Sequence, residues 1–177
     1  TEPTDIATAT TEDTTTAEEP VVEQAPAYNG PEWTTIELTN AVTGETFTLA
    51  DFAGQAVFVH PMATWCTNCR MSQTNIRDNV IGQLNRDDYA FISLSVETSL
   101  PTNNLARYAG DNGFNWTFAV LTPDALAALV RAFGPSISNP PVQPHFIIAP
   151  DGTPSGLMTG NDSADEIINN LNATRGA

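Results

Sequence analysis

One stretch decides the fold: Ala56-Val57-Phe58-Val59-His60-Pro61-Met62-Ala63-Thr64-Trp65-Cys66-Thr67-Asn68-Cys69, residues 56 to 69. Its first four residues are continuously apolar and rich in valine, which is typical of a strand buried on both faces in a parallel sheet. The apolar residues that follow the cysteines recur at about helical spacing as far as Leu84. Cys66 and Cys69 are therefore predicted to lie where a buried strand passes into a helix.

The two cysteines are the main chemical signal in the chain, which has 177 residues and no other cysteine. Two are too few for a disulfide framework or a four-cysteine zinc site, and their spacing is that of a redox pair. Partial positive charge at a helix N-terminus favours the thiolate of Cys66, which can then attack a substrate disulfide. Cys69, one helical turn later, can resolve the mixed disulfide. An inert structural disulfide and a metal site are the alternatives.

The remaining segments predict an α/β fold with a central mixed sheet flanked by helices and an N-terminal β-hairpin. The hairpin is expected from the alternating pattern on both sides of a turn at residues 40–44. A second hairpin is expected at Pro150-Asp151-Gly152, with Leu157-Met158 in its partner strand. The other predicted elements are strands at 89–96, 118–121 and 146–149, and helices at 67–84, 102–112, 123–133 and 163–171.

The first 27 residues differ in composition from the rest, because they hold seven acidic residues, many threonines and no basic or aromatic residue. Such a segment cannot bury enough apolar surface to offset its ordering entropy. We expect a disordered acidic Thr/Pro-rich linker over residues 1–27 and one domain over residues 28–177. The linker suits an exported protein of the periplasm or cell surface, with a membrane tether as one form of this. A linker inside a larger protein is the alternative.

The charge of the chain bears on its partners. Its formal net charge is −15 and it contains no lysine. Sequence-independent binding to nucleic acid or to an anionic membrane face is disfavoured, because repulsion replaces counterion release. No run of about 18 apolar residues is present to span a membrane. We expect a monomer that does not bind nucleic acid.

Four separated segments then carry a family resemblance: Leu49–Gln55, Ala63–Cys69, Phe133-Gly134 and Phe146–Gly152. In this order they resemble the thioredoxin-fold family, in particular the TlpA/ResA-like extracytoplasmic thiol-disulfide oxidoreductases. The resemblance implies a thioredoxin-like fold and a protein-disulfide reductase or oxidoreductase without a cofactor. It also implies client proteins that exchange disulfides with the pair, and a second thiol-disulfide partner that recycles it.

The resemblance further implies a cis-proline opposite the cysteines. By position this residue is Pro144, with Pro140 and Pro141 as weaker candidates. A cis-proline would turn the backbone so that Gln143 pairs with an extended substrate beside Cys66. Trp65 is expected to cover one side of the cysteine pair.

Both histidines depart from the family pattern. His60 stands six residues before Cys66, where thioredoxins bear a buried acid that handles the proton of the second cysteine. An imidazole with its ordinary pKa of about 6.5 could do the same, or it could be a neutral ring packed under the sheet. His145 directly follows Pro144 and is expected close to the cysteines, where it would tune the pair or contact the substrate.

These residues also open a second class of function. In the reduced protein Cys66, Cys69 and His145 would form a soft ligand set that suits Cu(I). SCO-type copper metallochaperones share the fold, but they space their cysteines by three residues, so the match is partial. The main interpretation remains redox exchange without a metal. Because Thr67 and Asn68 add no positive charge between the cysteines, we expect a mid-range to reducing couple.

Overall fold

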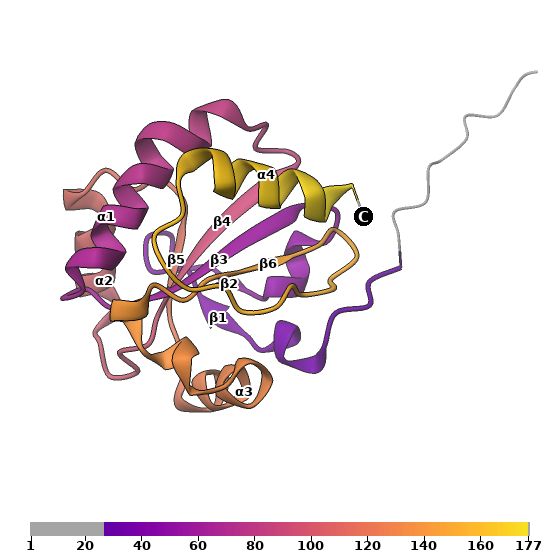
Figure 1. The fold of residues 1–177 in the computed structure, drawn as a ribbon. Helices are drawn as coiled ribbons and strands as arrows, with labels where there is room; N and C mark the ends of the chain where they lie inside the picture. Colours follow the sequence, from indigo (N-terminus) through magenta and orange to yellow (C-terminus); the bar gives the residue numbers. More distant parts are fainter. Residues whose placement is uncertain (1–26, 177) are drawn as a thin grey trace, which may run out of the picture.

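The structure is a computed structural model, and it describes residues 27–176. Nearly all of the linker expected over residues 1–27 lies outside the described residues. The centre of the fold is a four-stranded sheet in the order β5-β4-β3-β6 (Figure 1). Its strands are β3 (Ala56–Met62), β4 (Tyr89–Ser95), β5 (Thr117–Val120) and β6 (Phe146–Ile148). β3 pairs in parallel with β4 and antiparallel with β6, so the sheet is mixed as expected.

Helices cover both faces of the sheet (Figure 1). The helices are α1 (Thr67–Asn75), α2 (Thr102–Asp111), α3 (Pro123–Phe133) and α4 (Ala164–Arg175). α1, α2 and α4 contribute buried side chains to one apolar cluster, which also holds Phe58, Met62 and both cysteines. α3 packs on the opposite face, in a second cluster with Val57, Val59 and Phe146. The alternating residues of β3 therefore enter different cores, which explains why its pattern is continuously apolar.

The cysteines lie where the sequence places them, directly after β3 and at the start of α1. Every residue of β3 is buried, and the strand is longer than its apolar run because His60 and Pro61 extend it. α1 ends earlier than the predicted helix, since a π-helical turn over Ile76–Val80 and a short 3-10 turn follow it. The buried side chains Ile76 and Val80 keep the turns packed on the same core.

Two of the expected hairpin segments are shorter or less regular than predicted. The N-terminal hairpin is present as β1 (Leu38–Thr39) and β2 (Thr46–Phe47), which pair antiparallel. Residues 32–35 before it form a 3-10 turn instead of a strand, because Trp33 packs edge-on against Phe133 and Phe146. The partner expected for β6 is reduced to isolated bridges, one of which joins His145 to Met158.

The fold class is confirmed: the domain is thioredoxin-like, with a mixed sheet between helical layers and an N-terminal hairpin. Within residues 27–176, no helix combines the length and the apolar character needed to cross a membrane.

Candidate active site

Cys66 and Cys69 are joined by a disulfide, with their Cα atoms 5.3 Å apart. Cys66 is the N-cap residue of α1, and the backbone amide of Cys69 donates a hydrogen bond of 3.1 Å to its sulfur. The first amides of a helix lack backbone partners, so a sulfur at the N-cap receives one of them. The same amide would favour the thiolate of Cys66 after reduction.

The two sulfurs differ in access. Both cysteines are buried, but Cys66 is 3 % exposed whereas Cys69 is fully buried, so Cys66 is the more accessible of the two. Two large apolar side chains near the pair are exposed: Trp65, at 63 %, directly precedes Cys66, and Val142, at 37 %, belongs to the turn that packs against α1. Trp65 therefore borders the pair, but it is far more exposed than a residue that shields the sulfurs would be.

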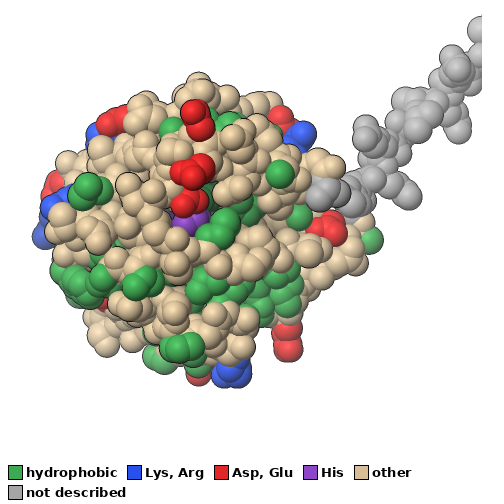
Figure 2. Space-filling view, in the orientation of Figure 1, with side chains coloured by type: hydrophobic (Ala, Val, Ile, Leu, Met, Phe, Trp, Pro, Cys, Tyr) green, Lys and Arg blue, Asp and Glu red, His purple; other side chains and the backbone are tan. Residues whose placement is uncertain are grey.

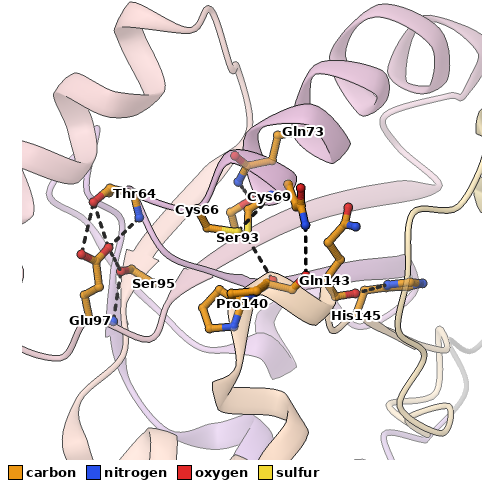
Figure 3. The surroundings of a disulfide bond; sticks show 12 residues. Thr64, Cys66, Cys69, Gln73, Ser93, Ser95, Glu97, Pro140, Gln143 and His145 are labelled. Carbon is orange, nitrogen blue, oxygen red and sulfur yellow. Dashed lines mark hydrogen bonds between the residues drawn. A yellow bond between two sulfur atoms is a disulfide. The ribbon is translucent and has the colours of Figure 1, made fainter.

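The turn that packs on the disulfide comes from a part of the chain about 70 residues away. It is the 3-10 turn Pro140–Val142, and Asn68 donates a hydrogen bond of 3.2 Å to its Pro141 carbonyl oxygen. The sulfur of Cys69 lies 3.4 Å from the carbonyl oxygen of Pro140. Figure 3 shows this turn beneath the disulfide, on the side of Gln143 and His145.

The expected substrate edge at Gln143 and Pro144 has a different geometry. Every peptide bond within residues 27–176 is trans, so the cis bond expected before Pro144 is not found. The chain turns instead at Gln143, which adopts a left-handed conformation with φ 53° and ψ 59°. This follows the long segment 135–143, which forms two 3-10 turns. The N–H of Gln143 donates a hydrogen bond to the Pro140 carbonyl oxygen (2.8 Å), and Pro144 has no N–H. Neither residue therefore has a free backbone donor to pair with a substrate.

His145 is buried and points away from the sulfurs (Figure 3). Its Nδ1 lies 3.1 Å from the carbonyl oxygen of Gln143, and its Nε2 lies 3.0 Å from a carboxylate oxygen of Asp162. His145 was expected close to the cysteines, but its ring contacts neither of them. It contacts Gln143, which directly follows the turn that packs on the disulfide. In the space-filling view a histidine side chain is visible at the surface, bordered by acidic side chains (Figure 2).

His60 lies on β3 opposite Ser93 of β4, on the sheet face that α1 covers. Both of its ring nitrogens are buried without a hydrogen-bond partner among the described residues. Burial first, and then the neighbouring His145, lowers the pKa of His60 to about 3. The premise that this ring titrates near working pH therefore does not hold here, because the ring is neutral at any pH well above 3.

A buried polar network lies behind Cys69, and the sequence alone did not indicate it. Ser93 accepts hydrogen bonds from Gln73 of α1 (3.1 Å) and from the indole of Trp116 (2.9 Å). Tyr108 donates to Gln73 (2.6 Å), and burial raises the pKa of this phenol to about 12. These bonds give the side chains of Gln73, Ser93, Tyr108 and Trp116 hydrogen-bond partners and fix the helix that carries the cysteines.

Glu97 is a second residue that sequence reasoning missed. Its carboxylate accepts hydrogen bonds from both the backbone amide and the hydroxyl of Thr64, at 2.6 and 2.9 Å. Ser95 donates to it at 3.4 Å, and Figure 3 shows the three residues on the side of the disulfide away from Gln143 and His145. Glu97 follows the end of β4, next to the strand that leads to Cys66. A carboxylate at this edge of a parallel sheet was the signal that could have found it.

The copper alternative requires Cys66, Cys69 and His145 to converge. Within residues 27–176, no three or more His, Cys, Asp or Glu side chains are placed so that they could hold a metal ion. In this oxidised state the two sulfurs bond to each other and His145 bonds to Gln143 and Asp162. The structure therefore brings together the two cysteines of the set and leaves the histidine apart.

Solved structures of several bacterial and plant proteins share this fold. A thiol:disulfide interchange protein of the thioredoxin family from Chlorobium tepidum is 22 % identical, with a TM-score of 0.62 over 85 % of this chain and 98 % of the other. A secreted Mycobacterium tuberculosis disulfide oxidoreductase homologous to Escherichia coli DsbE is 14 % identical, with a TM-score of 0.61 over 80 % and 98 %. Arabidopsis thaliana ScoI with copper bound is 11 % identical, with a TM-score of 0.61 over 78 % and 94 %.

Similarity at this level of identity shows the thioredoxin fold, in agreement with the resemblance found in the sequence. No functionally curated protein matches the chain significantly in sequence. The model of one family matches residues 21–153, which is most of the chain and includes the whole stretch from β3 through the cysteine pair to β6. The chain belongs to the AhpC/TSA family, on the thioredoxin fold.

Proposed function

We propose that the protein is a thiol-disulfide oxidoreductase that exchanges the Cys66–Cys69 disulfide with polypeptide clients outside the cytoplasm. The observation that carries this proposal is the difference between the two sulfurs. Cys66 is at the helix N-terminus, is 3 % exposed, and its sulfur accepts a hydrogen bond from the backbone amide of Cys69. Cys69 is fully buried against Pro140. An inert structural disulfide has no need of two sulfurs that differ in access and in hydrogen-bond environment, whereas stepwise exchange does.

In the reducing direction the exchange takes two steps. The thiolate of Cys66 attacks one sulfur of a client disulfide, forms a mixed disulfide and releases one client thiolate. The thiol of Cys69 then loses its proton and attacks the sulfur of Cys66, which restores the internal disulfide and releases the second client thiolate. Two electrons pass to the client, and a second dithiol must reduce the pair before the next cycle.

Exposed apolar side chains support polypeptides as the clients. Trp65 and Val142 are both exposed next to the disulfide. Isolated large apolar groups on a surface are common, but an exposed indole beside a reachable sulfur offers the kind of anchor that protein interfaces use. We therefore assign client contact to Trp65 and Val142, in place of the backbone edge expected at Gln143 and Pro144.

The proposed location rests on three observations. Disulfides persist in oxidising compartments such as the periplasm. One solved structure with this fold is of a secreted disulfide oxidoreductase. The acidic, threonine-rich composition of residues 1–27 suits an exported chain, with or without a membrane tether.

The function is tested by insulin reduction in the presence of dithiothreitol, with the wild-type protein and the Cys66→Ser and Cys69→Ser variants. We expect acceleration by the wild type and none by either variant. The reduction potential should be mid-range to reducing, and a value near about −120 mV, the level of a dedicated oxidant, would contradict this. A wild-type protein that neither reduces insulin nor oxidises a reduced protein substrate would refute the function.

Trp65 offers a matched comparison for client contact. Trp65→Ala should raise KM for a peptide disulfide several-fold, while the rate of reduction by dithiothreitol stays unchanged. Val42 serves as the control because it is exposed to a similar degree, at 59 %, but lies in the turn between β1 and β2. Val42→Ala should change neither quantity. Equal effects of the two substitutions would remove Trp65 from the proposed client surface.

A further inference from the structure

His145 is fixed on several sides. Phe58 stacks on its ring, with centroids 5.2 Å apart and an interplanar angle of 22°. Its backbone exchanges two hydrogen bonds with Met158, at 2.9 and 2.8 Å. Its two ring nitrogens face the Gln143 carbonyl oxygen and the Asp162 carboxylate. Asp162 is itself tied to the C-terminal end of α1, because Asn75 donates to its carbonyl oxygen at 3.2 Å.

Both groups that face the ring nitrogens are hydrogen-bond acceptors. A neutral imidazole carries a single N–H and can donate to only one of them, whereas the protonated ring donates to both. The arrangement therefore offers an acceptor to each ring nitrogen: the carbonyl oxygen of Gln143 to Nδ1 and the carboxylate of Asp162 to Nε2. A hydrogen bond donated to a carboxylate is charge-assisted, and such bonds are shorter and stronger than bonds between neutral groups.

The bond to Gln143 is linked to the redox pair by two short steps. The backbone of Gln143 is in the left-handed region, which residues other than glycine seldom adopt, so this conformation needs support from its neighbours. Its carbonyl oxygen accepts from His145, and its N–H donates to the Pro140 carbonyl oxygen. That same Pro140 oxygen lies 3.4 Å from the buried sulfur of Cys69.

We propose that His145, held by Asp162, is a positioning residue for the redox pair, and this rests on the function proposed above. Through Gln143 it keeps the Pro140 carbonyl oxygen where it accepts a hydrogen bond from the Cys69 thiol. That bond exists only after reduction, since the disulfide sulfur has no proton. It therefore stabilises the dithiol form relative to the disulfide form.

The consequence can be measured as an equilibrium. Dithiothreitol transfers two electrons and two protons: the Cys66–Cys69 bond breaks, both cysteines become thiols, and dithiothreitol closes its own disulfide. Loss of the support from His145 should lower the equilibrium constant of this reaction by about threefold to tenfold, as expected for one modest hydrogen bond. Tenfold corresponds to about 30 mV for a two-electron couple.

Two substitutions of His145 separate its two bonds. The amide nitrogen of asparagine can take the place of Nδ1, and that of the longer glutamine can take the place of Nε2. We expect His145→Asn to keep the bond to Gln143 but to lose the support of Asp162, and therefore to lower the equilibrium constant by clearly less than His145→Gln does. His145→Gln should lose that bond and show the full decrease. Equal shifts in both variants, or no shift in either, would overturn the proposal.

A second pair of variants keeps the test decisive if His145→Gln does not fold. Asp162→Asn removes the partner charge of His145, whereas Asp165→Asn removes an exposed charge nearby on α4. Asp162→Asn should shift the equilibrium in the same direction as His145→Gln, and Asp165→Asn should not. Equal behaviour of these two variants would also overturn the proposal.

The outcomes distinguish this proposal from the function on which it rests. The equilibrium with dithiothreitol requires only that the disulfide be reducible, whereas insulin reduction requires a client. If the wild type reduces insulin and the His145 variants all keep its equilibrium constant, the positioning role is wrong and the function stands. If the variants separate as expected but insulin is untouched, the positioning role stands and the client assignment is wrong.

Discussion

The backbone amide of Cys69 donates a hydrogen bond to the sulfur of Cys66, while the sulfur of Cys69 itself faces the carbonyl oxygen of Pro140. One sulfur thus receives a donor and the other meets an acceptor. After reduction the donor favours a thiolate at Cys66, and the acceptor favours a thiol at Cys69. The pair is therefore divided into a nucleophile and a resolving thiol by the fold itself.

This division predicts unequal alkylation. In the reduced protein, iodoacetamide at neutral pH should label Cys66 at least about tenfold faster than Cys69, because Cys66 is both better activated and better exposed. Peptide mass mapping after short labelling times measures the ratio. Guanidinium-unfolded protein is the control, in which the two rates should approach each other. Preferential labelling of folded Cys69 would reverse the assigned roles.

His60 predicts a specific pH dependence of stability. Its pKa is lowered to about 3 in the folded protein, so between pH 3 and 6.5 the unfolded state binds more protons than the folded state. The stability from keeping this ring neutral is fully present above about pH 6.5 and is lost as pH falls toward 3, by up to about 1.4 kcal/mol per pH unit. Urea unfolding between pH 4 and 7 should show this slope.

His60→Gln and His60→Leu remove the titrating group, and in both variants the free energy of unfolding should vary less with pH over this range. The difference from the wild type isolates His60, because the carboxylates with lowered pKa, such as Asp151 and Glu166, are present in all three proteins. Parallel curves for all three proteins would mean that the folded ring is protonated in this range. Since a ring with a pKa of about 3 is a weak base, we also expect resolution of the mixed disulfide to be nearly unchanged in His60→Gln.

Glu97 predicts a loss of stability that is local to the active-site loop. Glu97→Ala removes the acceptor for both the amide and the hydroxyl of Thr64, two residues before Cys66. Hydrogen bonds to charged groups contribute about 1.5–3 kcal/mol each, and the partial exposure of this site lowers their contribution. We therefore expect urea unfolding of Glu97→Ala to give a free energy of unfolding about 1–3 kcal/mol below that of the wild type. Glu45→Ala, in the exposed turn before β2, is the control and should change stability by less than about 0.5 kcal/mol. Similar losses of stability in the two variants would show that the hydrogen bonds between Thr64 and Glu97 contribute nothing to the free energy of unfolding.

Copper binding offers a direct test of the alternative ligand set. His145 is engaged with Gln143 and Asp162, so any Cu(I) bound by the reduced protein should be held by the thiolates of Cys66 and Cys69. Competition with a chromogenic Cu(I) chelator should give the same affinity for the wild type and His145→Ala, and a large loss for either cysteine variant. A large loss in His145→Ala, together with negligible insulin reduction, would instead support the metallochaperone.

The features predicted from the sequence are those with local signals. The strand-to-helix passage at Cys66 follows from a change of periodicity, and α3 and α4 begin within one residue of the starts predicted at 123 and 163. The hairpin and the order of elements follow in the same way. Such signals are contained within a few residues, so they need no knowledge of tertiary packing.

The missed features depend on contacts between distant segments. Glu97 reaches Thr64 across 33 residues, and Pro140 meets Cys69 across 71. The left-handed turn at Gln143 has no local preference behind it, because glutamine seldom adopts a positive φ without tertiary support. The position of His145 was predicted near the pair, but its partner Asp162 could be found only once the loop before α4 was placed.

Trapping of a client is the most direct test of the central claim. A peptide with one disulfide, incubated with reduced Cys69→Ser protein, should accumulate as a mixed disulfide with Cys66, because the variant can attack but cannot resolve. Reduced Cys66→Ser protein should trap little or none, since Cys69 is fully buried. Mass spectrometry of the two reactions identifies the linked cysteine. Equal trapping by both variants, or trapping by Cys69 alone, would contradict the account of Cys66 as the nucleophile that meets the client.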